Sequence, residues 1–205
     1  MINAYPELPS VPYERTEVDM WRVQDHIRAV PVDPEIQRAA YIMFRVESAN
    51  GKSGVNQNYC GMQADGNRWP ESLTHYFSGV VTEPENGTGR VRLFLAFARW
   101  EDCVDCLMDR VKARGLYIGA KALPISHMLV STEDDLVRAY TKEWARGDAK
   151  AEPSVDTIAS WRSMYGQAAA LFRHGHVAPA PVATNVDTTA DALNSAELTK
   201  LEGDT

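Results

Sequence analysis

The sequence predicts a mostly helical α+β domain with one small β-hairpin. In residues 91–97, large apolar side chains stand at every second position, and the turn signal Asn86-Gly87 comes just before them. Apolar residues recur at helical spacing in four long segments, at 33–50, 100–114, 132–145 and 155–172. Helices therefore surround a sheet of two or three strands.

The helix that begins at Asp33 has the clearest local signals. Asp33 suits the N-cap, Pro34 the first turn, and Glu35 the positive end of the helix dipole. Asn50-Gly51 indicates the end of this helix. Its apolar stripe is Ile36, Ala39, Ala40 and Met43.

The other elements follow from similar signals. Residues 18–30 form a helix-like stretch between prolines, and a polar, glycine-containing loop follows the helix at 33–50. Residues 67–98 have extended patterns. The helix at 100–114 ends at Gly115 and places Cys106 on its polar face.

Composition predicts one domain flanked by two tails. The 205 residues are 44% hydrophobic and carry 21 basic and 28 acidic side chains, for a net charge of −7. We expect an N-terminal extension at 1–14, the functional domain at 15–176 and a flexible acidic tail at 177–205. Five acids and one lysine give that tail a charge of −4.

The same figures exclude several classes of protein. A sequence pI near 5.2 argues against binding to duplex DNA or other nucleic acid, and no apolar run reaches the roughly 18 residues of a membrane span. Three cysteines are too few for a disulfide scaffold. Residues 1–10 lack a signal-peptide pattern, so we expect synthesis in the cytoplasm.

Glu47 is the most informative single residue. At about 100° per residue it lies within about 40° of the apolar stripe of its helix, near the end where the dipole disfavours negative charge. Both effects raise a carboxyl pKa, as a general acid requires. The alternatives are a structural ion pair with Arg92 or Arg99, or exposure after an earlier helix end.

Residues 47–63 resemble two motifs of the N-acetylglucosaminidase family of bacterial autolysins, flagellar peptidoglycan hydrolases and phage lysins. The family carries E-S-G-x-G-x-S followed by N-N-L-F-G-I-K, and this chain has E-S-A-N-G-K-S and N-Y-C-G-M-Q. Three later segments match in the same order: V-V-T-E-P-E-N-G at 80–87, F-A-R-W at 97–100 and R-G-L-Y at 114–117. Cys60 and Pro84 depart from the usual phenylalanine and tyrosine.

The resemblance implies a lysozyme-like fold, with a helical domain and a small β-hairpin lobe flanking a cleft. It also implies cleavage of peptidoglycan glycan strands without a cofactor or metal. The implied catalytic residues are Glu47, Glu83 and Tyr117. The implied substrate-binding residues are Ser48, Asn58, Tyr59, Gly61, Gln63 and Trp69.

Glycoside hydrolysis requires a proton for the leaving oxygen and stabilisation of an oxocarbenium-like transition state. Glu47 would supply the proton, and Glu83 would activate water or stabilise charge, with Glu85 and Asp65 as nearby substitutes. The substrate's N-acetyl group is an alternative to a second enzyme acid. Aromatic residues that could stack on sugars are Tyr59, Trp69, Tyr76 and Tyr117.

Other readings remain open at this stage. A muramidase or lytic transglycosylase would share the fold, and a non-catalytic virion or cell-wall-binding protein would retain the fold alone. Cys103-x-x-Cys106 and His174-x-His176 give four metal ligands on paper, but their spacing is not that of a zinc site. We expect action on the bacterial cell wall, from a virion or after delivery by another protein. The tail is either the segment that contacts such a partner or a solvated end without a function.

Overall fold

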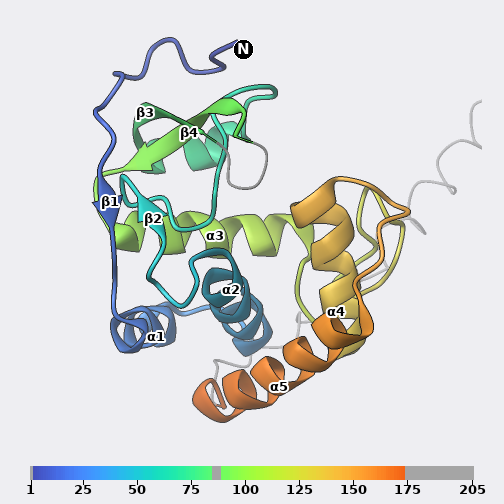
Figure 1. Ribbon diagram of the computed structural model, residues 1–205. Helices are drawn as coiled ribbons and strands as arrows, with labels where there is room; N and C mark the ends of the chain where they lie inside the picture. The colour runs from blue at the N-terminus through green and yellow to red at the C-terminus, as the bar shows by residue number, and fades with distance from the viewer. Residues whose placement is uncertain (1, 85–88, 174–205) are drawn as a thin grey trace, which may run out of the picture.

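A computed structural model describes residues 2–84 and 89–173 and has the mixed α+β architecture expected from the sequence (Figure 1). Residues 85–88, which include Glu85 and part of the predicted turn, and the predicted acidic tail at 177–205 lie outside the described residues. The elements are β1 (Arg15–Thr16), α1 (Met20–Ala29), α2 (Pro34–Glu47), β2 (Gly54–Val55), η1 (Glu71–Tyr76), β3 (Phe77–Pro84), β4 (Val91–Phe97), α3 (Trp100–Arg114), α4 (Glu133–Tyr140), the π-helical η2 (Thr141–Arg146) and α5 (Val155–Leu171).

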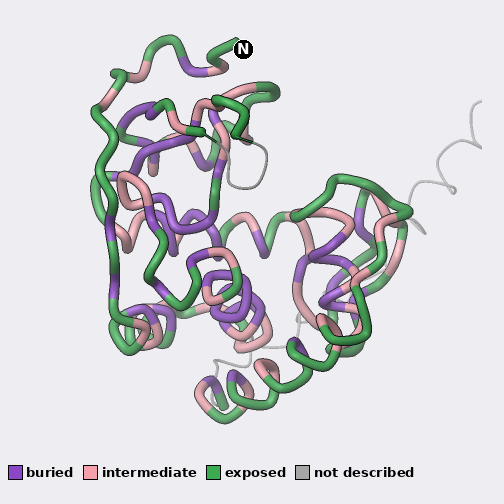
Figure 2. The backbone as a smooth tube through the Cα atoms, viewed as in Figure 1, coloured by how far each residue is buried: buried purple, intermediate pink, exposed green. Residues whose placement is uncertain are grey.

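Helix α3 runs through the middle of the molecule, and α1, α2, η1 and β4 pack against it (Figure 1). Helix α2 contacts both α3 and α5, while α1 contacts α2 and α3. Burial is most continuous along α2 and α3, whereas α5 is exposed along much of its length (Figure 2). Ala39 and Ala40 on α2 are fully buried, and such small side chains allow neighbouring helices to approach closely.

Helix α2 begins as predicted but ends earlier than expected. Asp33 accepts a hydrogen bond from the backbone N–H of Glu35 at 2.7 Å. The helix stops at Glu47, and the next residues turn through left-handed conformations at Ala49, Asn50 and Gly51. Glycine is required at the last of these, because a Cβ there would lie 2.1 Å from a backbone oxygen of the segment before α1.

The β-lobe, defined here as η1, β3 and β4, lies against α3. Strands β3 and β4 pair antiparallel, with Val80 opposite Leu95, and this confirms the predicted hairpin. The N-terminal extension packs on the lobe, since Ser10 forms a parallel bridge with Val80. Tyr5 is only 1% exposed and meets Phe77 edge to face at 5.6 Å. Hydrophobic contact therefore holds residues before β1 against the lobe.

Helix α3 has its predicted bounds, but the prediction for Cys106 is wrong. Cys106 is fully buried, because Met62 packs over it with 3.8 Å between the two sulfur atoms. The periodicity of residues 100–114 does not show that the loop containing Met62 covers this side of the helix.

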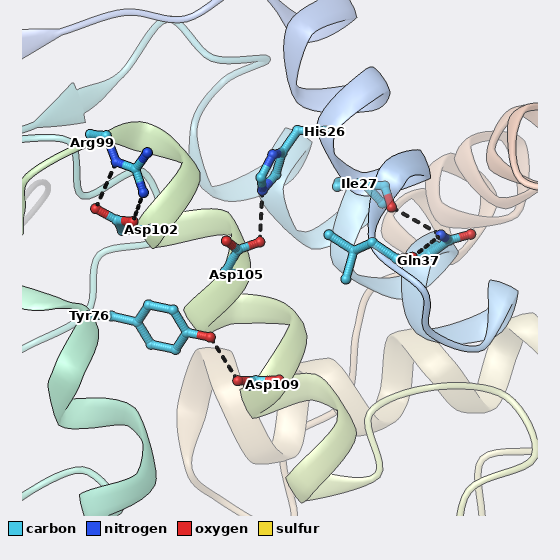
Figure 3. Close-up of polar contacts among 9 residues, drawn as sticks. His26, Ile27, Gln37, Tyr76, Arg99, Asp102, Asp105 and Asp109 are labelled. Atoms are coloured by element: carbon cyan, nitrogen blue, oxygen red, sulfur yellow. Dashed lines mark hydrogen bonds and ion pairs between the residues drawn. The ribbon is translucent and has the colours of Figure 1, made fainter.

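Acidic side chains of α3 bind neighbouring segments (Figure 3). Asp105 accepts from His26 of α1 at 2.7 Å, and Asp109 accepts from the Tyr76 hydroxyl at 2.9 Å. Tyr76, a candidate for sugar stacking, is therefore tied to α3. Gln37 of α2 donates to the backbone oxygen of Ile27 at 2.9 Å and links α2 to α1.

The segment predicted as one helix at 132–145 is an α-helix continued by a π-helix. Thr132 and Asp135 form a capping box at the start of α4. After Tyr140 the α-helix continues as the wider π-helix η2. This helix ends at Gly147, whose backbone has a left-handed conformation. Helix α5 lies beside α4, and the Trp161 ring packs on the Tyr140 ring with centroids 4.6 Å apart.

None of the helices in the described part of the chain has both the length and the apolar character needed to cross a membrane.

The hydrogen bonds of the Asn58 side chain hold the loop before the β-lobe, and a substitution of Asn58 tests how much they stabilise the fold. Its amide donates to the carbonyls of Met62 and Leu95, both at 2.9 Å, and its oxygen accepts from two backbone N–H groups of the loop. Asn58→Ala should lower the free energy of unfolding by about 2–4 kcal/mol, because it leaves buried backbone groups without partners. Urea unfolding measures this, with exposed Asn67→Ala as the control; equal stability of the two variants would contradict the assignment.

Candidate functional site

Glu47 is the last residue of α2 and is held against the junction of α4 and η2. The hydroxyl of Tyr140 donates a hydrogen bond to its Oε1. Trp144, one helical turn further along, is a second donor to the same carboxyl. The described chain contains no ion pair with Glu47, since Arg92 pairs with Asp65 and Arg99 with Asp102. The alternative of a structural Glu–Arg pair is therefore wrong.

Burial raises the pKa of the Glu47 carboxyl above its ordinary value. The hydrogen bonds from Tyr140 and Trp144 act in the opposite direction, because they favour the charged form, but desolvation is the larger effect. The direction is the one expected from the position of Glu47 beside the apolar stripe. Burial therefore shifts the Glu47 carboxyl toward its protonated form, which is the form that a general acid needs.

Tyr140 is itself in a setting that keeps its proton. Burial, followed by the charge of Glu47, raises the pKa of its hydroxyl far above the ordinary value. The hydroxyl therefore acts as a donor to Glu47. Tyr140 and Trp144 were not predicted from the sequence, because aromatic residues on the apolar face of a helix are usually core residues. The available signal was their spacing of four residues, which places two aromatic donors on one face.

A pocket of about 420 Å³ lies next to this carboxyl. The loop after Asn58 and the side chain of Trp69 form one wall, the C-terminal part of α3 forms another, and η2 forms the third. Glu47 is not itself among the lining residues. Two lining residues, Cys60 and Trp144, interact with Glu47, so its carboxyl adjoins this part of the wall. The lining residues are Cys60, Gly61, Met62, Gln63, Trp69, Arg110, Arg114, Leu116, Glu143, Trp144, Ala145, Arg146 and Gly147.

Three of the predicted substrate-binding residues meet in this pocket: Gly61, Gln63 and Trp69. The indole N–H of Trp69 donates to the backbone oxygen of Gln63 at 2.8 Å, which fixes the ring against the loop. The Trp69 and Trp144 rings meet edge to face with centroids 6.0 Å apart. Two indoles at the edge of a polar pocket form a surface suited to the apolar face of a sugar ring.

The other three predicted substrate-binding residues are buried and bind within the chain. The Ser48 hydroxyl donates to the Phe44 carbonyl at 2.5 Å and accepts from the Gly51 N–H at 2.8 Å, which fixes the turn after α2. Asn58 holds its own loop, as described above. Tyr59 is 1% exposed and its ring packs on that of Phe44. These residues shape the wall of the pocket from behind it.

Glu83 and Tyr117, the other predicted catalytic residues, are not among the lining residues. Glu83 lies on β3 opposite Arg92, and burial raises the pKa of its carboxyl. Tyr117 follows α3 and packs partly buried against the core. Asp65, the substitute for Glu83, forms an ion pair with Arg92 at 2.8 Å.

Glu143 lines the pocket, and both of its carboxylate oxygens accept hydrogen bonds from the protein. Its side chain is fully buried and pairs with Arg114, and its Oε1 accepts from the backbone N–H groups of Ile125 and Ser126, both at 2.8 Å. Glu143 therefore ties η2 to α3 and to the loop that follows α3. It is a structural ion pair beside the acid and not a second free carboxylate.

The three cysteines are buried free thiols, and one of them, Cys60, also lines the pocket. A hydrogen bond with Cys103, together with burial, raises the pKa of the Cys60 thiol. Residues 2–84 and 89–173 contain no group of three or more side chains placed to hold a metal. His174 and His176 lie outside the described residues.

Comparison of the chain with protein-family models, with curated proteins and with solved structures gives no match.

The raised pKa of Glu47 predicts a stability effect with a definite sign. At pH values above this pKa, the wild type must ionise a buried carboxyl on folding, and Gln cannot ionise. We expect Glu47→Gln to be more stable than wild type at neutral pH. The gain should disappear below pH 4, where the carboxyl is protonated in both the folded and the unfolded state.

Thermal unfolding at pH 3.5 and pH 7.5 measures the difference, with exposed Glu71→Gln as the control. A Glu47→Gln variant less stable than wild type at pH 7.5 would show that the fold favours the charged carboxylate.

Proposed function

We propose that this protein is a glycoside hydrolase that cleaves peptidoglycan glycan strands, as an N-acetylglucosaminidase, with Glu47 as the general acid. The observation that carries the proposal is a carboxyl whose pKa is raised by burial and which adjoins the wall of a pocket with two tryptophan rings. The motifs at 47–63 supply the choice of substrate. A helical domain with a small β-lobe is compatible with the lysozyme-like fold that we propose with them.

The first chemical step requires proton transfer to the glycosidic oxygen as the bond to the sugar breaks. Tyr140 donates to Oε1 of Glu47 and so orients the carboxyl. In the proposed step, Glu47 transfers its carboxyl proton to the leaving oxygen. As the proton leaves, the carboxylate that forms is stabilised by its two donors, Tyr140 and Trp144. The same contacts thus position the acid and stabilise its conjugate base.

The second requirement is stabilisation of the positive sugar ring or activation of water. Glu83 on β3 is our candidate, and it has no ion pair within the described chain. Its pKa is raised by burial alone. The substrate's N-acetyl group is the alternative, and it requires no second enzyme acid. Asp65 is less suited, because Arg92 holds its carboxylate.

The proposal extends to where the enzyme works. We propose that it acts on the bacterial cell wall as part of a virion or after delivery by another protein, as a phage lysin does. Residues 177–205 are the proposed contact with that partner.

Digestion of purified peptidoglycan tests the function and the acid together. Wild type should produce new N-acetylglucosamine reducing ends, and Glu47→Gln should reduce the rate at least about 100-fold, because a general acid contributes about 10² to 10⁴ in rate. Mass spectrometry of the fragments identifies the ends. Muramic acid ends, or their anhydro form, would instead identify a muramidase or a lytic transglycosylase.

Two comparisons complete that experiment. Glu83→Gln should reduce the rate about as severely as Glu47→Gln if Glu83 is the second acid, and should have little effect if one acid suffices. Exposed Glu71→Gln is the matched control for both. Folded wild type that binds glycan without cleaving it would contradict the enzyme and support a non-catalytic wall-binding protein.

Tyr140→Phe predicts a shift in the pH dependence of the rate. The hydrogen bond from Tyr140 lowers the pKa of Glu47, so its loss should raise that pKa further. The rate falls at high pH as the acid loses its proton, so this basic limb should move to higher pH in the variant. Profiles of kcat against pH measure the shift.

Tyr165→Phe is a matched control, because the Tyr165 hydroxyl also donates to a glutamate, Glu35, at 2.7 Å. Its profile should match that of wild type. A basic limb for Tyr140→Phe that is unchanged or moves to lower pH would contradict the role given to Tyr140.

A further inference from the structure

The pocket beside Glu47 has more positive than negative charge in its lining. Three guanidinium groups, those of Arg110, Arg114 and Arg146, line it together with one carboxylate, that of Glu143. Arg114 and Glu143 pair with each other and so neutralise one another. Two positive charges therefore remain in the lining.

Arg110 is the more informative of the two. It is partly buried, and its guanidinium lies over the Trp69 ring, 5.2 Å from the ring centroid. No carboxylate within residues 2–84 and 89–173 pairs with it. Burial, and to a lesser extent the charge of Arg114, lowers the pKa of Arg110, while Glu143 acts in the opposite direction. An anion in the pocket would compensate the positive charge of Arg110.

Arg146 adds a second, accessible guanidinium at the end of η2. It is exposed, lines the same pocket, and has no ion pair in the described part of the chain. Guanidinium groups favour carboxylates, because their parallel N–H donors match the two carboxylate oxygens. The rings of Trp69 and Trp144 stand beside these groups and offer an apolar face to a sugar.

We propose that this pocket binds a carboxylate-bearing unit of the glycan, with Arg110 and Arg146 pairing with the carboxylate and Trp69 and Trp144 packing against the sugar. The inference rests on the proposed function and deepens it, because it makes the negative charge of the strand a determinant of binding. A neutral strand of N-acetylglucosamine alone would leave both guanidinium groups without a partner.

Two sources of that carboxylate exist in peptidoglycan. One is the lactyl group of muramic acid, and the other is the peptide stem attached to it. Isothermal titration calorimetry with Glu47→Gln, which should not consume the ligand, separates them with three tetrasaccharides of equal length. These are a neutral N-acetylglucosamine oligomer, a peptide-free strand with free lactyl carboxylates, and a strand that carries peptide stems.

We expect at least one charged strand to bind about tenfold or more tightly than the neutral one, with the advantage reduced by salt. Preference for the peptide-free strand identifies the lactyl carboxylate, and preference for the stem-bearing strand alone identifies the peptide. Either result supports the proposal. Equal affinity for all three strands would overturn it.

Arginine substitutions added to the Glu47→Gln protein test whether the preference for charged strands arises in this pocket. Arg110→Gln and the exposed Arg146→Gln should each lower affinity for the preferred strand several-fold and leave affinity for the neutral strand nearly unchanged. Arg22→Gln is the matched control, because Arg22 lies over another indole, Trp100, outside the pocket. Retention of the full charge preference in both pocket variants would also overturn the proposal.

The binding experiment can contradict the proposal for the pocket without contradicting the proposed function, and the reverse also holds. The function is tested by hydrolysis with wild type, whereas the pocket is tested by equilibrium binding without hydrolysis. Hydrolysis that depends on Glu47, without a charge preference, would refute only the pocket. A charge preference without hydrolysis would refute only the enzyme.

Discussion

The hydrogen bond from Tyr140 to Glu47 is the interaction on which the site depends. It joins the end of α2 to the junction of α4 and η2, two parts of the chain separated by 93 residues. It orients the carboxyl, while burial raises the pKa of that carboxyl. A buried carboxyl without such a donor would have no fixed direction, and an exposed one would lose its proton near neutral pH.

The rest of the fold positions the two ends of this bond. Helix α2 stops at Glu47 because the next residues turn through left-handed conformations, and Gly51 permits the close approach to the segment before α1. On the other side, the π-helical turn η2 brings Trp144 to the same carboxyl. Glu143 anchors that turn through Arg114. Wider helical turns of this kind are frequent at functional sites.

The sequence was sufficient for most of the local elements and for the direction of the pKa shift at Glu47. Caps and periodicity predict the starts of α2 and α3, and the position of Glu47 beside an apolar stripe predicts its burial. Tyr140 and Arg110 could not be found in this way, because their roles depend on which distant segments pack against them. The burial of Cys106 was missed for the same reason, since the loop that covers it precedes it by about 40 residues.

The most direct test of this account is the titration of Glu47 itself in the intact protein. Carbon-13 NMR of the glutamate carboxyl groups, with Glu47→Gln used to assign the signal, gives its pKa. We predict a midpoint above the ordinary glutamate value of about 4.3, and a higher midpoint still in Tyr140→Phe. A midpoint at or below the ordinary value would mean that Glu47 is charged under working conditions, and it would contradict its assignment as the general acid.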